Sequence, residues 1–251
     1  KRTAAIWLAA GLCSAVPAWG GTVIETSSSE QGLNRMLISG DRVRMESGGR
    51  VMLFDASSTT MTFVDPSRKQ YQVMDEQDVR KMAEQMKQMR AQIERQLENV
   101  PEGQREQMRK QMESMMPGAA EAPEMRVEAT GGSATVAGAT CREARVYRGD
   151  EPAHTVCVAD PEALGIPRGD FETMMSMFGF FEDMAGGASG GGSIGARAMR
   201  RMMEELGGMP ARASSLQGGS EWEIRKVESR SIEDSRFRVP TGYEQGRSFG
   251  D

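Results

Sequence analysis

The side chains with the most distinctive chemistry in this sequence are its 21 methionines. Thioether sulfur is a soft ligand that suits copper(I), so clustered methionines favour a copper-binding function. No histidine or cysteine accompanies the clusters, and their spacing is also that of a buried helix face. The leading prediction therefore has no metal and no cofactor, and a copper(I)-binding protein is the alternative. The clusters are Met82/Met86/Met89, Met112/Met115/Met116, Met174/Met175/Met177 and Met199/Met202/Met203.

Two cysteines lie on neighbouring strand-like runs. Cys141 and Cys157 flank a turn at residues 148–152 that contains Gly149 and a proline. Folding the hairpin about Gly149, with a loop of about three or about five residues, would place the two cysteines opposite each other. In an oxidising compartment this spacing predicts a disulfide. His154, the sole histidine, differs in parity from Cys157 along the strand, so we expect it on the other face, as a surface residue.

No arrangement of residues predicts an enzyme. The sequence has one histidine and shows no cluster of His, Cys and Asp, so the usual catalytic groupings are missing. The formal net charge of −5 makes the chain a poor generic partner for nucleic acid. We expect a non-catalytic protein that does not bind nucleic acid.

The elements that must position these residues follow an export signal, which we expect at residues 1–20. It has a basic start at Lys1 and Arg2, an apolar run over residues 4–15 and small residues around Ala18. The run is too short to cross a bilayer, which takes ~20 apolar residues, and no later stretch approaches that length. The sequence therefore predicts a periplasmic or secreted protein without a membrane span.

The rest of the sequence, residues 21–251, is expected to form one α+β domain. Polar and apolar residues alternate at 60–64 and again at 70–74, which predicts antiparallel strands with one buried face. Asp65-Pro66 between them is a type I turn signal. The predicted parts are a β meander at 21–74, a helical insertion at 75–118, β hairpins at 125–160, helices at 161–210 around a glycine-rich linker at 186–195, and C-terminal strands at 211–243.

The spacing of apolar residues becomes helical after Asp75. Apolar side chains recur there at steps of three and four residues, with charged and amide side chains on the other faces. Pro101 interrupts the pattern, and a second amphipathic stretch covers residues 102–116. The polar face of these helices allows a further alternative, a structural or chaperone-like protein that binds a protein partner.

Four motifs follow one another along the chain: Ser39-Gly40-Asp41-Arg42-Val43-Arg44-Met45, the helix broken by Pro101, Val136-Ala137-Gly138 ahead of Cys141, and Phe237-Arg238-Val239-Pro240-Thr241-Gly242-Tyr243. In this order they resemble the motifs of a family of exported bacterial proteins that is named only as a domain of unknown function. The architecture is also similar, more distantly, to the periplasmic lipoprotein carriers of the LolA type. That resemblance implies a half-open antiparallel barrel with inserted helices as a lid over an apolar cavity.

The leading functional prediction is a binding module for an apolar ligand, a lipid or a lipoprotein. The sheet and the methionine-bearing helix would enclose the ligand, because flexible methionines adapt to irregular apolar molecules. Alternation along the strands would send one set of side chains inward, facing the apolar stripe of the helix. The expected ligand-binding residues are Val51, Leu53, Phe63, Tyr71, Val73, Met82, Met86, Met89 and Ile93.

Overall fold

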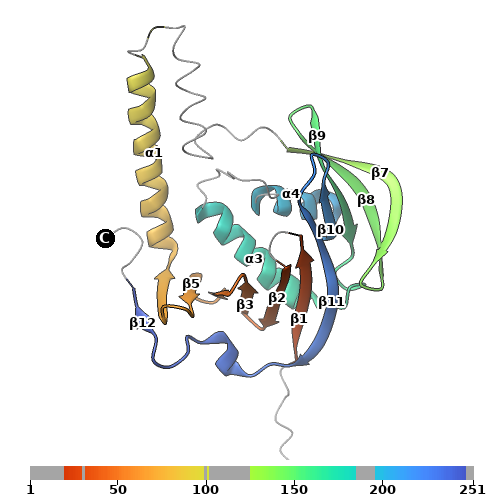
Figure 1. The fold of residues 1–251 in the computed structure, drawn as a ribbon, viewed down its shortest axis with the longest axis horizontal. Coiled ribbons are helices and arrows are strands. Elements are labelled where there is room, and N and C mark those ends of the chain that lie inside the picture. The colour runs from red at the N-terminus through yellow and green to blue at the C-terminus, as the bar shows by residue number, and fades with distance from the viewer. Residues whose placement is uncertain (1–19, 30–31, 99–100, 102–124, 185–195, 247–251) are drawn as a thin grey trace, which may run out of the picture.

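The computed structural model of the protein describes residues 20–29, 32–98, 101, 125–184 and 196–246. These residues form one sheet of twelve strands, with helices α3 and α4 on its concave side (Figure 1). The predicted antiparallel meander is confirmed. The sheet is open, with β12 and β7 as its two edges, so it does not close into a barrel. Residues 1–19 of the predicted export signal, the second amphipathic stretch at 102–116 and the glycine-rich linker at 186–195 lie outside the described residues.

The N-terminal strands form the predicted meander, each antiparallel to the next. Its last turn, between β5 and β6, follows the expected chemistry: the backbone N–H and the hydroxyl of Ser67 donate to Asp65 Oδ1, at 3.0 and 2.5 Å. These hydrogen bonds, with the Ser67 hydroxyl first, lower the pKa of Asp65. The strands are β1 (Gly20–Ser28), β2 (Gly32–Ser39), β3 (Arg42–Ser47), β4 (Arg50–Asp55), β5 (Thr60–Asp65) and β6 (Gln70–Met74).

The remaining strands join the meander through its first strand. β11 pairs with β1, so the order across the sheet is β12-β6-β5-β4-β3-β2-β1-β11-β10-β9-β8-β7. Strands are predicted throughout 211–243, but residues 234–237 of that range form a short 3₁₀ helix, η1 (Asp234–Phe237). The later strands are β7 (Met125–Val136), β8 (Ala139–Arg148), β9 (Glu151–Ala159), β10 (Met209–Ser215), β11 (Glu221–Ser231) and β12 (Glu244–Gln245), which runs parallel to β6.

The strand register decides which side chains face the helices. Ile24, Met36 and Met45 stand opposite one another on β1, β2 and β3, and the row continues through Met52 to Phe63. This row belongs to or packs against the largest core cluster, together with residues of α3. Successive strand residues point to opposite faces, so the neighbours of this row lie on the convex face.

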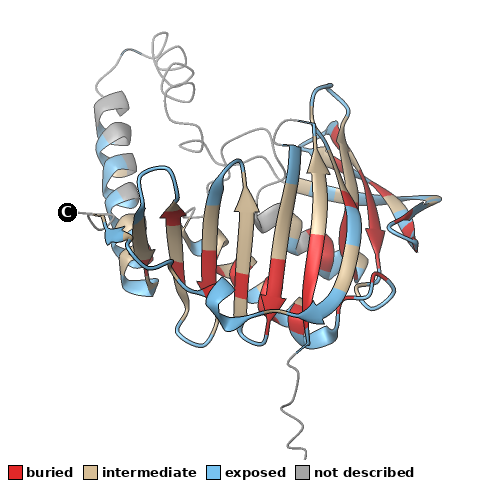
Figure 2. Cartoon of the chain, turned by 60° about the horizontal axis from the view of Figure 1, so that its bottom comes forward, coloured by how far each residue is buried: buried red, intermediate tan, exposed pale blue. Residues whose placement is uncertain are grey.

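The convex face has a small apolar cluster of its own. Val23 and Leu37, paired across β1 and β2, pack with Ile232 and Phe237. The segment containing η1 crosses this face of the sheet (Figure 2). The guanidinium of Arg42 lies 4.9 Å from the centre of the Phe237 ring and bonds to Asp234 at 2.8 Å. The C-terminal segment is therefore held against β3 by both apolar and ionic contacts.

The predicted disulfide between Cys141 and Cys157 is confirmed, with their Cα atoms 5.4 Å apart. The predicted register is wrong: Cys141 stands opposite Ala159, and Cys157 stands opposite Glu143. A tight turn at Gly149 and an irregularity after Val146 shift the pairing. The disulfide therefore joins β8 and β9 across a diagonal rather than between directly paired residues.

The long helix α1 (Glu76–Glu98) begins at a side-chain cap. The backbone N–H groups of Gln77 and Asp78 donate to Asp75 Oδ1, at 2.8 and 2.9 Å, which satisfies two of the free donors at the helix start. Val79 is buried and Met82 packs against the core, but Met89, two turns further on, is 45% exposed. α1 thus packs at its base and extends away from the sheet (Figure 1). Within the described residues no helix is long and apolar enough to cross a membrane.

The helices α3 (Arg168–Met184) and α4 (Ala196–Leu206) cover the concave face instead. The first turn of α3 is fixed to the sheet by buried polar contacts. The Thr22 hydroxyl donates to Asp170 Oδ2 at 2.5 Å, and the Thr173 hydroxyl donates to the Gly40 carbonyl at 2.9 Å. Burial raises the pKa of Asp170, although the hydrogen bond from Thr22 opposes this effect.

Two substitutions at Asp170 are expected to differ sharply in their effect on stability. Asp170→Ala leaves the fully buried Thr22 hydroxyl without its acceptor, so the free energy of unfolding should fall by about 1–3 kcal/mol. Asp170→Asn keeps an oxygen acceptor and removes the buried charge, so it should match or exceed the wild type at neutral pH. Urea unfolding curves of the three proteins test this difference, and equal losses in both variants would contradict it.

The contact between Thr22 and Asp170 also makes the stability of the protein depend on pH. The carboxyl pKa is raised in the folded protein, so the native state binds the proton more tightly than the unfolded state does. Relative to Asp170→Asn, the wild type should therefore gain stability as the pH falls through the raised pKa towards 3.8, the ordinary value. If the difference in the free energy of unfolding between the wild type and Asp170→Asn stays constant with pH, the raised pKa of Asp170 is contradicted.

Candidate ligand cavity

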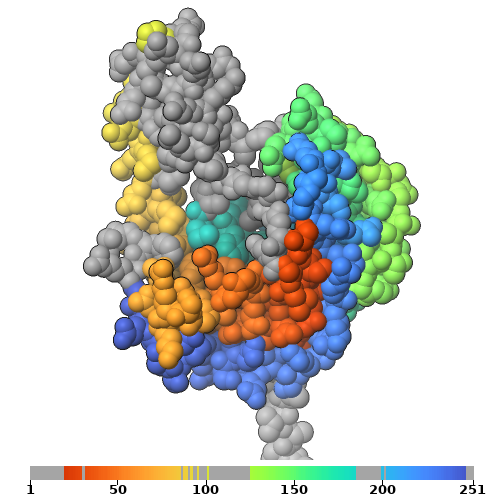
Figure 3. Space-filling model, in the orientation of Figure 1, coloured from red at the N-terminus to blue at the C-terminus, as the bar shows by residue number. Residues whose placement is uncertain are grey.

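A cavity of about 350 Å³ lies between the concave face of the sheet and helices α3 and α4. This volume is within the range of small-molecule sites, roughly 300–1,000 Å³. The space-filling view shows α3, in teal, flanked by the orange and red meander strands and the blue C-terminal strands (Figure 3). The residues that line it are Ile24, Thr26, Ser28, Asn34, Arg35, Met36, Met45, Glu46, Ser47, His154, Met174, Phe178, Met199, Met203, Met209, Pro210, Ala213, Ser220 and Trp222.

Helical and strand periodicity bring the apolar part of this lining together. Met174 and Phe178 are four residues apart on α3, and Met199 and Met203 are four apart on α4, so each pair lies on one helix face. On the sheet, Met36 and Met45 are directly paired. With Met209 of β10, six methionines border one cavity. Their flexible side chains suit an apolar molecule of irregular shape.

The polar lining residues gather at one end of the cavity. Ser28 and Ser47 end β1 and β3, and Ser220 lies just before β11. Asn34 stands opposite Thr26, near the β1–β2 turn, and His154 stands opposite Ser215, the last residue of β10. All these positions lie near the same ends of their strands, on the side of the sheet where the β1–β2 turn lies. This end of the cavity therefore combines polar side chains with Trp222, which stands opposite Ser28.

Two polar side chains at that end have unusual surroundings. Asn34 Oδ1 is the one buried side-chain polar atom of the described residues that has no hydrogen-bond partner. His154 is 7% exposed, so the expectation of a surface histidine is wrong. Burial, aided by the positive charge of Arg148, lowers the pKa of His154, which keeps the imidazole neutral at neutral pH.

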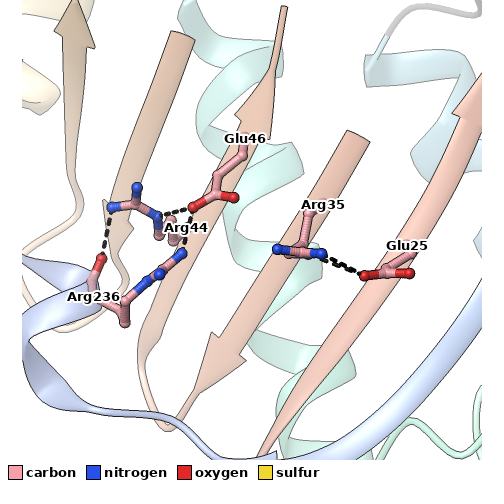
Figure 4. Close-up of polar contacts among 5 residues, drawn as sticks. All are labelled: Glu25, Arg35, Arg44, Glu46 and Arg236. Atoms are coloured by element: carbon pink, nitrogen blue, oxygen red, sulfur yellow. Dashed lines mark hydrogen bonds and ion pairs between the residues drawn. The ribbon is translucent and has the colours of Figure 1, made fainter. Parts of the chain in front are cut away.

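The two ionic residues among the lining, Arg35 and Glu46, adjoin Met36 and Met45 along their strands, so their side chains point to the convex face and are paired there. Arg35 Nη2 contacts Glu25 Oε1 at 2.7 Å (Figure 4). Glu46 Oε1 accepts from Arg44 and from Arg236, each at 2.6 Å. Burial disfavours the ionised Glu46 carboxyl, but the hydrogen bond from Arg44 and the charges of Arg44 and Arg236 outweigh it and lower its pKa. These ionic contacts therefore lie on the face of the sheet opposite to the cavity.

The residues expected to bind the ligand lie elsewhere. Val51 and Tyr71 are both paired with Val64, and Leu53 and Val73 with Thr62, so these four lie on the convex face. Phe63 faces the helices and packs against the core cluster, but it does not line the cavity.

The helical residues of that prediction do not line the cavity either, as far as the structure describes them. Met82 packs against the core and Met89 is largely exposed. The side chains of Met86 and Ile93 lie outside the described residues. Sequence reasoning missed the cavity because it assigned the lid to α1 rather than to α3 and α4. The spacing of four between Met199 and Met203 was a usable signal, but their partner strand could not be identified.

The methionines of each cluster considered for copper do not all reach the cavity. Met174, Met199 and Met203 line the cavity, whereas Met177 and Met202 are buried in core clusters. The cluster at residues 112–116 lies outside the described residues. Within the described part of the chain, no three His, Cys, Asp or Glu side chains gather as a metal site would require.

Comparison with known proteins adds little to this geometry. No protein-family model and no curated protein matches the sequence. Among solved structures, the chain is similar to that of PNGF-II, with 10% sequence identity and a TM-score of 0.37. The match covers 90% of this chain and 30% of PNGF-II, so the chain spans less than a third of that protein's length. A likeness at this TM-score supports no conclusion about function.

Proposed function

We propose that the protein is a non-catalytic binding protein that holds an apolar ligand between its sheet and helices α3 and α4. The observation that carries the proposal is the cavity of about 350 Å³ with six methionines, Phe178 and Trp222 in its lining. Burying apolar surface is favourable by about 25 cal/mol per Å², so a chain-like apolar molecule would bind there without any covalent or ionic contact. α3 and α4, rather than α1, would form the lid over a half-open barrel.

An oxidising compartment is part of the same proposal. The disulfide between Cys141 and Cys157 supports it, since such bonds persist mainly in exported proteins. A periplasmic carrier of lipids or related apolar molecules would fit both the disulfide and the cavity. A protein-binding role for the polar face of α1 stays a prediction.

Titration with N-phenylnaphthylamine, a neutral dye that fluoresces in apolar surroundings, tests the proposal. We expect saturable enhancement with one dye per protein, accompanied by a change in the fluorescence of Trp222, which lines the cavity. Trp222 is the one tryptophan of the described residues. An absence of saturable binding to the folded wild type would overturn the proposal.

A second candidate function is copper(I) binding at the same cavity. The observation in its favour is that six thioethers and a neutral imidazole line one site, and both ligand types suit copper(I). The variant Met199→Leu/Met203→Leu separates the two functions, because leucine keeps the apolar volume and removes the sulfur. Retained dye binding together with unchanged competition for copper(I) against bicinchoninate would exclude the copper function. A selective loss of copper(I) binding would favour it.

A further inference from the structure

The two edges of the sheet differ in whether another segment covers them. At one edge β12 pairs with β6, and the backbone N–H groups of Glu244 and Gly246 donate to the carbonyls of Lys69 and Tyr71, at 2.9 and 2.8 Å. At the other edge β7 pairs with β8, and no described segment pairs with the outer side of β7 (Figure 1). An edge strand with unpaired N–H and C=O groups is a ready site for a further strand.

The first residues of β7 have charged side chains on one face and apolar side chains on the other. Val127 is directly paired with Val146, and together with Met125 it packs against the apolar cluster that includes residues of α4. Both Met125 and Val127 are only partly buried in that cluster. Arg126 and Glu128 alternate with them, so they lie on the convex face, where both side chains are about half exposed and form an ion pair.

This pattern is complementary to a second copy of itself. When two β7 strands pair antiparallel about a two-fold axis at Val127, Arg126 of each copy stands opposite Glu128 of the other. On the apolar face, Val127 meets Val127, and Met125 meets Ala129. Opposite charges and apolar side chains that stand directly across two strands both favour pairing. An interface in which the same residues meet on both sides is the commonest kind in homodimers.

The charge pattern also disfavours the other registers. A shift by two residues places Arg126 opposite Arg126, or Glu128 opposite Glu128, and like charges in these positions are destabilising. A shift by one residue exchanges the two faces, so apolar side chains would stand opposite charged ones. After Ala129 a bulge interrupts the pairing with β8 up to Ser133, which ends the regular part of the strand. One antiparallel register therefore remains.

We propose that the protein forms a symmetric dimer through its β7 edges, with Val127 at the two-fold axis and the two sheets continuing into one another. Glu128 then lies between Arg145, its partner on β8, and Arg126 of the second copy. The partly buried Met125 and Val127 are covered by the same residues of the second copy. The paired stretch is short, so the dimer is reversible rather than permanent. This inference does not depend on the ligand cavity.

Sedimentation velocity of charge variants over a series of protein concentrations tests the inference. The wild type should form a dimer as its concentration rises. Arg126→Glu and Glu128→Arg each place like charges opposite one another, so either variant alone should dimerise about tenfold more weakly or worse. A mixture of the two variants should regain the dimer, because an acidic edge then meets a basic one. The control Arg50→Glu changes an exposed charge on β4, far along the sheet, and should dimerise like the wild type.

Cysteine cross-linking locates the two-fold axis. Only the residue on the axis meets its own copy, so Val127→Cys should give a disulfide-linked dimer on mild oxidation, whereas Ala129→Cys should not. A wild type that stays monomeric, a mixture of the charge variants that stays monomeric, or charge variants that dimerise like the wild type would each overturn the inference. Cross-linking of Ala129→Cys in place of Val127→Cys would overturn the register. A regained dimer in the mixture also shows that both charge variants are folded.

Discussion

Replacing Met199 by glutamate is expected to weaken binding of N-phenylnaphthylamine more than tenfold, whereas Met89→Glu should leave it unchanged. Met199 lines the cavity from α4, so a carboxylate there puts an unpaired charge beside the apolar ligand. Met89 is 45% exposed on α1 and does not line the cavity. Both variants replace a helical methionine by glutamate, so a difference in their dye binding depends only on where the methionine lies.

The helix should survive the first substitution. Residue 199 lies near the start of α4 (Ala196–Leu206), where a negative side chain is favourable to the helix dipole. Circular dichroism spectra and urea midpoints of both variants serve as the control for folding. A second variant, Ala213→Phe, fills the cavity from β10 without adding charge and should also block the dye. A loss of binding in Met89→Glu but not in Met199→Glu would place the site against α1 instead.

Removing the disulfide is expected to lower the free energy of unfolding by about 3 kcal/mol. The bond closes a loop with a sequence separation of 16 residues, and a loop of this length restricts the unfolded chain by roughly that amount. Both cysteines are buried, so the appropriate variant is Cys141→Ala/Cys157→Ala, which places no new polar group in the core.

Urea unfolding with and without dithiothreitol provides the measurement. The wild type should lose stability on reduction. The double variant should be less stable from the start, and dithiothreitol should not change its stability. The control is a thiol titration of the denatured, unreduced wild type, which should detect neither Cys141 nor Cys157. An unfolding midpoint of the wild type that does not move on reduction would contradict a stabilising disulfide.

Local sequence was sufficient for the strands of the meander and for the start of α1. Alternation at residues 60–64 and 70–74, with Asp65-Pro66 between them, predicts β5, β6 and their turn correctly. Asp75 marks the beginning of the helix because its side chain accepts from nearby backbone N–H groups. The pairing of Cys141 with Cys157 was likewise predictable, since only two cysteines flank one hairpin. These features depend on residues close in sequence.

The sequence did not reveal which face of each strand is buried. Val51 and Leu53 are apolar like their neighbour Met52, so the strand has apolar residues on both faces. The convex face is partly covered by the η1 segment, and this contact is far away in sequence. A local pattern of period two therefore identifies a strand without assigning its inner face.

What the sequence by itself determined is a set of antiparallel strands, amphipathic helices and one disulfide. The tertiary structure alone decided that β11 pairs with β1, that α3 and α4 cover the concave face, and that Asn34 and His154 reach one cavity. The physical reason is that pairing between distant strands depends on complementary faces across the whole chain, and no local propensity encodes it. The candidate site is composed almost wholly of such long-range neighbours, so it could be located only in the folded protein.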